Sequence, residues 1–177
     1  MKRLSPPRVA AAATDHESGS LHYATGRKQK IILQASVLAT MHKHRQFRKG
    51  DPEAGGMLFA RISAQAISVE EVTEPQRKDR RWRFGFWPCN TIQQRIIDNR
   101  FKEGLHFVGE WHTHPELHPH PSGLDFTSME NCFLQSRHEL KALIMVILGT
   151  ASAPDGLWVS LHNRKGSRRL KLTAASL

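Results

Sequence analysis

The sequence has little cysteine, few aromatic residues and no long apolar run. Its 177 residues include two cysteines, one tyrosine and 7% aromatic residues in total. Cys89 and Cys132 lie far apart and form no Cys-x-x-Cys motif, so neither a disulfide framework nor a thiolate zinc site is predicted. We expect two buried free thiols, although the sequence leaves open a Cys-His nucleophile pair.

Membrane-directed segments are also missing. No apolar run approaches the ~20 residues that a helix needs to cross a bilayer. Near the N-terminus the apolar patch covers only residues 9–13, which is shorter than a signal-peptide core of about 7–15 residues. The sequence therefore predicts a cytoplasmic protein with no membrane partner.

Acidic residues are outnumbered by basic ones. There are 16 acidic and 26 basic residues, which gives a net charge of +10 with clusters at residues 77–83 and 164–171. Such clusters can neutralise phosphates, but no nucleic-acid-binding module is recognisable and the aromatic residues form no stacking platform. An acidic protein partner or a generally basic surface explains the charge equally well, so we do not expect a nucleic-acid partner.

Periodicity predicts one α/β domain with a mixed, curved sheet flanked by helices. Residues 1–28 are small, polar and rich in Pro and Ala, and are expected to form a flexible arm before a domain at residues 29–177. The expected helices cover Lys30–Arg48, Thr91–Lys102 and a segment from about Leu124 to His138. The expected strands cover Gly56–Ile62, Ala66–Val72, Trp82–Trp87, His106–His114, Ala142–Leu148 and Leu157–His162.

Residues 110–125 carry the densest chemical pattern. In a strand that ends near His114, alternation projects His112 and His114 to one face, where two imidazoles can share a zinc ion. Prolines stiffen the loop that follows. Asp125 then falls on the first turn of the next helix, where the helix dipole favours its ionised form. Two histidines and one aspartate would leave a fourth metal position open for water.

Each part of this pattern also has a purely structural explanation. The sequence Ser122-Gly-Leu-Asp125 is a helix-capping pattern, and an isolated His-x-His is more often incidental than metal-binding. The combination of His-Thr-His-Pro, a loop of six residues and Ser-x-x-Asp favours a metal centre.

These residues resemble the signature of the JAMM (MPN+) zinc metalloproteases, which cut isopeptide or peptide bonds after ubiquitin and ubiquitin-like domains. The signature also requires an upstream glutamate, and Glu53-Ala-Gly-Gly matches that segment. The resemblance covers roughly residues 30–165 and implies an MPN-like domain.

The resemblance implies one zinc ion on His112, His114 and Asp125, with water as the fourth ligand. It further implies that Glu53 is the general base and that Ser122 stabilises the tetrahedral oxyanion. Without the resemblance, Glu53 would be interpreted as an exposed loop acid. Ser122 can cap the helix in either case.

A narrower resemblance involves residues 109–116 and the Arg- and Trp-rich residues 80–86. Both are similar to bacterial JAMM peptidases encoded beside ubiquitin-activating- and ubiquitin-conjugating-like enzymes, best known from CBASS antiphage operons. This implies a ubiquitin-like protein or a conjugated target protein as substrate. It also implies ubiquitin-transfer-like enzymes and a nucleotidyltransferase as partners.

Several other side chains have open assignments. Glu110 shares a strand face with the histidines, so it is either a competing base, an acceptor that orients an imidazole, or an ordinary strand residue. His118 and His120 are expected to be substrate-facing or incidental rather than primary ligands. Four aromatic residues either line a groove for an extended C-terminal tail or pack in the core: Trp82, Phe84, Phe86 and Trp87.

Three functions remain in competition. The first is an active zinc isopeptidase, which the presence of all five signature residues favours. The second is a binding module in which the intact site is structural. The third, prompted by the net charge of +10, is a metal-dependent hydrolase linked to nucleic acid.

Overall fold

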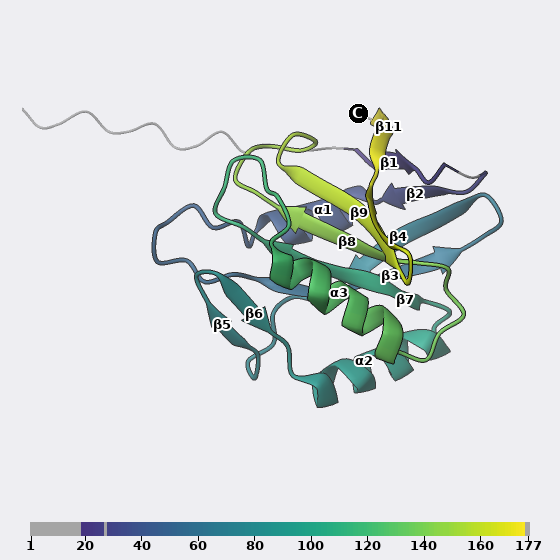
Figure 1. Cartoon of the computed structure of the whole chain (residues 1–177), viewed down its shortest axis with the longest axis horizontal. Coiled ribbons are helices and arrows are strands. Elements are labelled where there is room, and N and C mark those ends of the chain that lie inside the picture. Colours follow the sequence, from purple (N-terminus) through teal and green to yellow (C-terminus); the bar gives the residue numbers. More distant parts are fainter. Residues whose placement is uncertain (1–18, 27, 176–177) are drawn as a thin grey trace, which may run out of the picture.

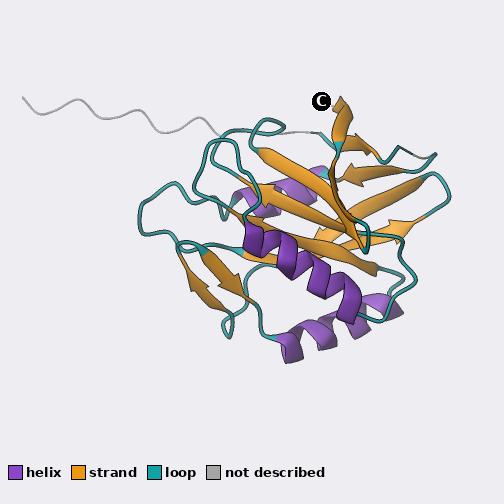
Figure 2. Ribbon diagram, viewed as in Figure 1, coloured by secondary structure: helices purple, strands orange, loops and turns teal. Residues whose placement is uncertain are grey.

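The computed structural model describes residues 19–26 and 28–175, so residues 1–18 of the expected arm lie outside it. Along the described chain, three helices are interspersed among eleven strands (Figures 1 and 2). The helices are α1 (Ala35–His42), α2 (Asn90–Lys102) and α3 (Gly123–Gln135). The strands are β1 (Leu21–Ala24), β2 (Lys30–Leu33), β3 (Gly55–Ile62), β4 (Ala66–Val72), β5 (Arg80–Trp82), β6 (Gly85–Trp87), β7 (His106–Thr113), β8 (Leu143–Leu148), β9 (Leu157–Asn163), β10 (Gly166–Arg169) and β11 (Lys171–Ala175).

Nine strands form one sheet in the order β10-β9-β8-β7-β3-β4-β2-β1-β11, and β5 and β6 form a separate hairpin. The pairs β2–β4 and β7–β8 are parallel, whereas the other neighbours are antiparallel. The sheet is strongly curved, because its two edge strands, β10 and β11, are separated in the chain by the single residue Leu170. The expected mixed, curved sheet between helices is confirmed.

Side-chain alternation assigns the helices to the two faces of the sheet. The even-numbered residues of β8 share a buried cluster with Val37 and Leu38 of α1. Its odd-numbered residues pack with Met129 of α3, and Met57 and Phe59 of β3 pack against α2. Helix α1 therefore covers one face and α2 and α3 the other, as Figure 1 shows. All six residues of β8 are buried, as its continuous apolar run predicted.

Both ends of the expected first helix, Lys30–Arg48, are wrong. Lys30–Leu33 forms strand β2, and helix α1 begins only at Ala35 and ends at His42. The strand is favoured because Ile31 and Leu33 alternate into the core, where neither is exposed, while the backbone pairs with β1 and β4.

Three further boundaries differ from expectation. Leu21–Ala24, which we assigned to the arm before residue 29, forms β1 and pairs with β2 and β11. The single strand expected over Trp82–Trp87 is a hairpin of two short strands, because the chain reverses at Arg83 and Phe84. Strands β10 and β11 follow β9, where no further strand was predicted.

The three helices are short. Within the part of the chain that the structure describes, none is long and apolar enough to cross a membrane. Cys89 and Cys132 are free, as expected, and half-buried. Burial, helped by the charge of Glu110, raises the pKa of Cys132 to about 12, which disfavours the thiolate needed by a nucleophile.

Candidate metal centre

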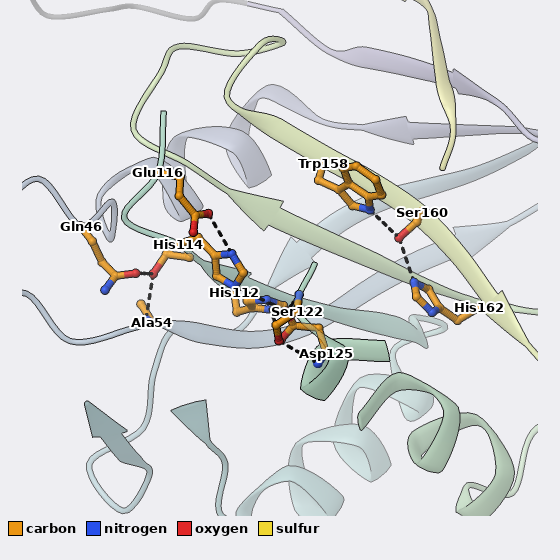
Figure 3. Close-up of polar contacts among 11 residues, drawn as sticks. Gln46, Ala54, His112, His114, Glu116, Ser122, Asp125, Trp158, Ser160 and His162 are labelled. Carbon is orange, nitrogen blue, oxygen red and sulfur yellow. Dashed lines mark hydrogen bonds and ion pairs between the residues drawn. The ribbon is translucent and has the colours of Figure 1, made fainter. Parts of the chain in front are cut away.

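Strand β7 and the residue after it present two imidazoles toward the same side of the sheet (Figure 3). The ring centroids of His112 and His114 are 5.0 Å apart, and the rings are tilted by 52°. Their side chains are only 12% and 13% exposed. The alternation expected from their spacing is therefore confirmed.

Asp125 lies on the first turn of α3 and faces both rings. Its Oδ1 is 3.3 Å from Nε2 of His112, and its Oδ2 is 3.6 Å from Nε2 of His114. Oδ2 also accepts from the Ser122 N–H at 2.6 Å, and Ser122 Oγ accepts from the Asp125 N–H at 3.2 Å. These two bonds form a capping box, which fixes the carboxylate beside the imidazoles.

Glu53 comes from a different part of the chain, just before β3. The side chain is buried, and one of its oxygens lies within 4.8 Å of a ring nitrogen of each histidine. Burial raises the pKa of Glu53 to about 7, with His112 opposing this shift and Asp125 adding to it. The interpretation as an exposed loop acid is therefore wrong. Glu53 can exchange a proton near neutral pH.

Charge in the site is arranged to receive a cation. Burial would raise the pKa of Asp125, but contact with His112 and hydrogen bonds at the helix start hold it well below its usual value. Burial would lower the pKa of His112, but three nearby carboxylates, on Asp125, Glu53 and Glu110, raise it. Burial and the neighbouring His112 lower the pKa of His114.

A metal ion fits this residue set. Nε2 of His112 is buried and makes no hydrogen bond within the described chain, although Asp125 Oδ1 is 3.3 Å away. Burying a polar atom without a partner is costly, and a bound cation would remove that cost. Imidazole nitrogens and carboxylate oxygens are ligands of zinc sites that activate water. The residues that could hold the ion are His112, His114, Asp125 and Glu53.

Two glycines at the start of β3 permit close packing around the site. A Cβ on Gly55 would lie 2.7 Å from Cδ1 of Phe86, and one on Gly56 would lie 2.1 Å from the Thr73 carbonyl oxygen. Neither position has room for a side chain. Gly55 therefore lets Phe86 of the β5–β6 hairpin pack directly against the strand that follows Glu53, and Gly56 lets the Thr73 backbone approach the same strand.

The converging side chains line a groove of about 1720 Å³, together with residues of the hairpin, α2, α3 and the sheet. Trp82, Phe84 and Trp87 of the hairpin are 47%, 69% and 50% exposed, and the two tryptophan rings stack at 5.3 Å. Phe84, Phe86 and Trp87 line the groove. Of the four aromatic residues, only the half-buried Phe86 is consistent with core packing. The alternative expectation, that these residues line a groove, agrees better with the exposed side chains of the hairpin.

The family can be stated from a comparison with known proteins. Residues 34–161 match the family described as prokaryotic homologs of the JAB domain. This chain is a JAB-family protein. The resemblance to JAMM proteins seen in the sequence is thus confirmed.

Similar JAB-family proteins carry the name CD-NTase/cGAS isopeptidase. A Pseudomonas aeruginosa protein is 34% identical over 129 residues, which cover 71% of this chain and 81% of the relative. An Escherichia coli protein is 26% identical over 144 residues, covering 80% and 87%. A Vibrio cholerae protein of the same name is 27% identical and covers 67% and 76%. These relatives agree with the narrower bacterial subgroup.

A solved structure supports the fold. The solution structure of a Desulfitobacterium hafniense protein superposes with a TM-score of 0.57 at 22% identity. It covers 77% of this chain and 87% of that protein. The JAB-type α/β architecture is therefore shared at low sequence similarity.

Glu110, His118 and His120, whose roles the sequence left open, lie in two different places in this JAB domain. Glu110 lines the same groove as the metal-binding candidates, and burial raises its pKa. His118 and His120 line a separate cleft of about 430 Å³. Their Nδ1 atoms lie 3.1 Å from the carbonyl oxygens of Asp155 and His118, respectively. The structure does not bring these two histidines to the site.

Glu116 is a site residue that the sequence analysis missed. Its Oε2 lies 3.2 Å from Nδ1 of His114, a contact that leaves Nε2 of that ring for a metal. The sequence shows that Glu116 lies two residues after His114. Because Pro115 lies between them, the sequence did not indicate that the Glu116 side chain would point toward the His114 ring. Gln46, which is buried close to Thr113, was missed because it lies far away in the sequence.

Proposed function

We propose that this JAB-family protein is a zinc-dependent isopeptidase. It hydrolyses the amide bond that joins a ubiquitin-like protein, or the C-terminus of a conjugated protein, to its target. The relatives named CD-NTase/cGAS isopeptidase support a nucleotidyltransferase conjugate in a bacterial, CBASS-type antiphage pathway. The observation that carries the proposal is the convergence of Glu53, His112, His114 and Asp125 at one groove.

In this proposal His112, His114 and Asp125 hold one zinc ion, which supplies Lewis acidity toward water and the scissile carbonyl. Glu53 accepts a proton from the water that adds to the carbonyl carbon. When the C–N bond breaks, Glu53 returns the proton to the leaving amine. A pKa of about 7 for Glu53 suits both transfers near neutral pH.

Ser122 is assigned to the oxyanion that forms at the carbonyl oxygen. Its Oγ already accepts from the Asp125 N–H at 3.2 Å, which restrains the hydroxyl at the edge of the groove. The O–H can then donate to the developing negative charge. Capping α3 and stabilising the oxyanion are compatible roles for this one side chain.

The β5–β6 hairpin is assigned to substrate binding. Within the described chain its two strands form a ladder only with each other, although the Trp82 carbonyl of β5 also accepts from the Glu53 N–H. We therefore assign the edge of β6 to an extended peptide. Main-chain hydrogen bonds along that edge would hold a C-terminal tail, and Phe84 and Trp87 would cover its apolar side chains. Ubiquitin-transfer-like enzymes would supply the conjugate.

The direct test is cleavage of a purified nucleotidyltransferase conjugate, followed by mass spectrometry of the products. We expect cleavage that stops with a zinc chelator and returns when zinc is added. Glu53→Gln should lower kcat by about 10²–10⁴-fold while zinc content is kept. Glu70→Gln is the control, because Glu70 pairs with Arg61 at 3.2 Å and does not line the groove.

Full activity in the presence of the chelator, or in Glu53→Gln, would refute the proposed roles. A protein that holds stoichiometric zinc and binds the conjugate tightly, but cleaves no conjugate, would instead be a binding module.

A further inference from the structure

Thr113 separates the two histidines and points to the opposite face of β7, where it is completely buried. Its Oγ1 accepts from the Ala54 N–H at 3.0 Å and donates to Oε1 of Gln46 at 3.0 Å. Its backbone N–H donates to the Ala54 carbonyl at 2.8 Å. Because Ala54 follows Glu53, Thr113 connects the histidine strand to the neighbour of the carboxylate.

Gln46 uses its whole side-chain amide in this connection. The residue is 3% exposed. While Oε1 accepts from Thr113, Nε2 donates to the carbonyl oxygens of Asp51 at 3.1 Å and Arg83 at 2.9 Å. Asp51 lies on the segment that leads to Glu53, and Arg83 lies in the turn of the hairpin. One amide therefore joins the histidine strand, the Glu53 segment and the hairpin.

The hairpin also holds the backbone of Glu53 directly. The Glu53 N–H donates to the Trp82 carbonyl at 2.7 Å. The Glu53 carbonyl accepts from Nε of Arg81 at 2.7 Å. Both backbone groups of Glu53 are thus bonded to residues of strand β5, so displacement of the hairpin would displace Glu53.

These bonds matter because Glu53 lies in neither a helix nor a strand. The segment between the end of α1 at His42 and the start of β3 at Gly55 is irregular, apart from turns. The histidines, in contrast, lie on or directly beside a strand paired on both sides. A catalytic carboxylate must be held within about 0.5 Å of its productive position. The position of the Glu53 carboxylate therefore depends on hydrogen bonds between its segment and the neighbouring elements.

We propose that Thr113, Gln46 and Arg81 are positioning residues, which fix Glu53 relative to the histidine strand and make the hairpin and Glu53 one rigid unit. This inference rests on the proposed isopeptidase function. It implies that a peptide seated against the hairpin is aligned with the proton-accepting group by the same bonds.

The first test compares Thr113→Val with Thr113→Ser. Valine keeps the shape of threonine but removes the hydroxyl, whereas serine keeps the hydroxyl. We expect Thr113→Val to lower kcat by about 10–10²-fold, with KM and zinc content nearly unchanged. Thr113→Ser should restore most of the loss. Equal losses in both variants, or no loss in Thr113→Val, would overturn the proposal.

The second test compares Arg81→Ala with Arg80→Ala. Both remove one positive charge from β5, but the Arg80 side chain is exposed. We expect about a 10-fold loss of kcat in Arg81→Ala and less than about a twofold change in Arg80→Ala. Equal losses of kcat in the two variants would show that the effect comes from removing a positive charge from β5 and would overturn the role of Arg81. In a Glu53→Gln background, Arg81→Ala should have little further effect, because the group that it positions is gone.

A third measurement does not depend on activity, so it separates failure of this inference from failure of the proposed function. Hydrogen exchange is followed at the Ala54 and Glu53 amides. Thr113→Val should speed exchange at Ala54 and also, through the shared unit, at Glu53 by about 10-fold or more. Gln34→Leu, which removes a side-chain bond to Ser68 of 2.9 Å, is the control. Unchanged exchange at Glu53 in Thr113→Val would show that the unit is not coupled.

Discussion

Two His-x-His pairs follow one another in this chain, and they have different surroundings. His112 and His114 lie at the end of β7, with the Asp125 carboxylate 3.3 and 3.6 Å from their Nε2 atoms. His118 and His120 lie in the following loop, where each Nδ1 is 3.1 Å from a carbonyl oxygen.

The difference shows that the His-x-His spacing alone does not create a candidate metal centre. A strand brings residues i and i+2 to one face, whereas a proline-rich loop imposes no such alternation. Carboxylates converge on the first pair, but the second is engaged by backbone carbonyls, and the His120 ring packs 5.5 Å from Trp158. Backbone geometry and neighbouring charge therefore distinguish a candidate metal centre from an incidental pair.

The largest contrast is expected when one ring is removed from each pair. His112→Ala should lower zinc affinity by more than about 100-fold and abolish cleavage, because a ligand is lost. His118→Ala should keep stoichiometric zinc. Elemental analysis after dialysis measures both, and loss of zinc from His118→Ala alone would reverse the assignment.

Removing the charge of Asp125 should weaken zinc binding by His112 and His114. Asp125→Asn keeps an oxygen that can accept from the Ser122 N–H, so the helix cap survives. Zinc affinity should fall by about 100-fold, since one charged ligand becomes neutral. A competition titration with a zinc indicator measures it, and unchanged affinity would remove Asp125 from the ligand set.

His162, which belongs to neither pair, adds a pH dependence of stability. His162 is buried, with Nε2 2.8 Å from Ser160 Oγ, and burial lowers its pKa from 6.5 to about 4. As pH falls, the unfolded chain binds the proton first. The stability that His162 contributes above pH 6.5 is therefore lost progressively as pH falls from 6.5 to about 4.

Between pH 7 and 5 this loss should reach about 2 kcal/mol. Denaturant unfolding of the wild type and His162→Gln at both pH values measures it. The variant should lose less stability on acidification. Equal losses in the two proteins would show that His162 is not kept neutral by the fold.

The smallest effect is expected from Glu116, which contacts the far side of the His114 ring at 3.2 Å. Glu116→Gln keeps a hydrogen-bonding side chain but removes the charge, so zinc affinity should fall by about 10-fold. The same zinc titration detects it. A change larger than that of Asp125→Asn would mean that Glu116 is itself a ligand.

Local patterns predicted much of the fold. The Gly56–Ile62 and Ala66–Val72 strands, the helix beginning near Thr91 and the buried strand before Gly149 are all present. Strand β2 was missed because Lys30–Leu33 adjoins a helix and its own four residues have no decisive periodicity. Its partners β1 and β4 decide its structure, and pairing between separate segments cannot be read from local periodicity.

The site residues likewise divide into those that local sequence predicted and those that it did not. His112, His114, Ser122 and Asp125 lie within one short segment, and the structure brings them together. Glu53 was identified only through the family pattern. Gln46 belongs to no motif, and Arg81 was noted only as one of the Arg- and Trp-rich residues 80–86. Their proposed positioning roles come from contacts with residues 67 and 28 positions away.

The place of β7 inside the sheet has one more consequence. It is paired with β3 on one side and β8 on the other, and the Trp111 side chain is anchored in the core. We therefore expect the polypeptide to stay folded without the proposed zinc, unlike small domains that unfold when they lose their metal. Removal and return of the proposed zinc should therefore be reversible, without a refolding step in between.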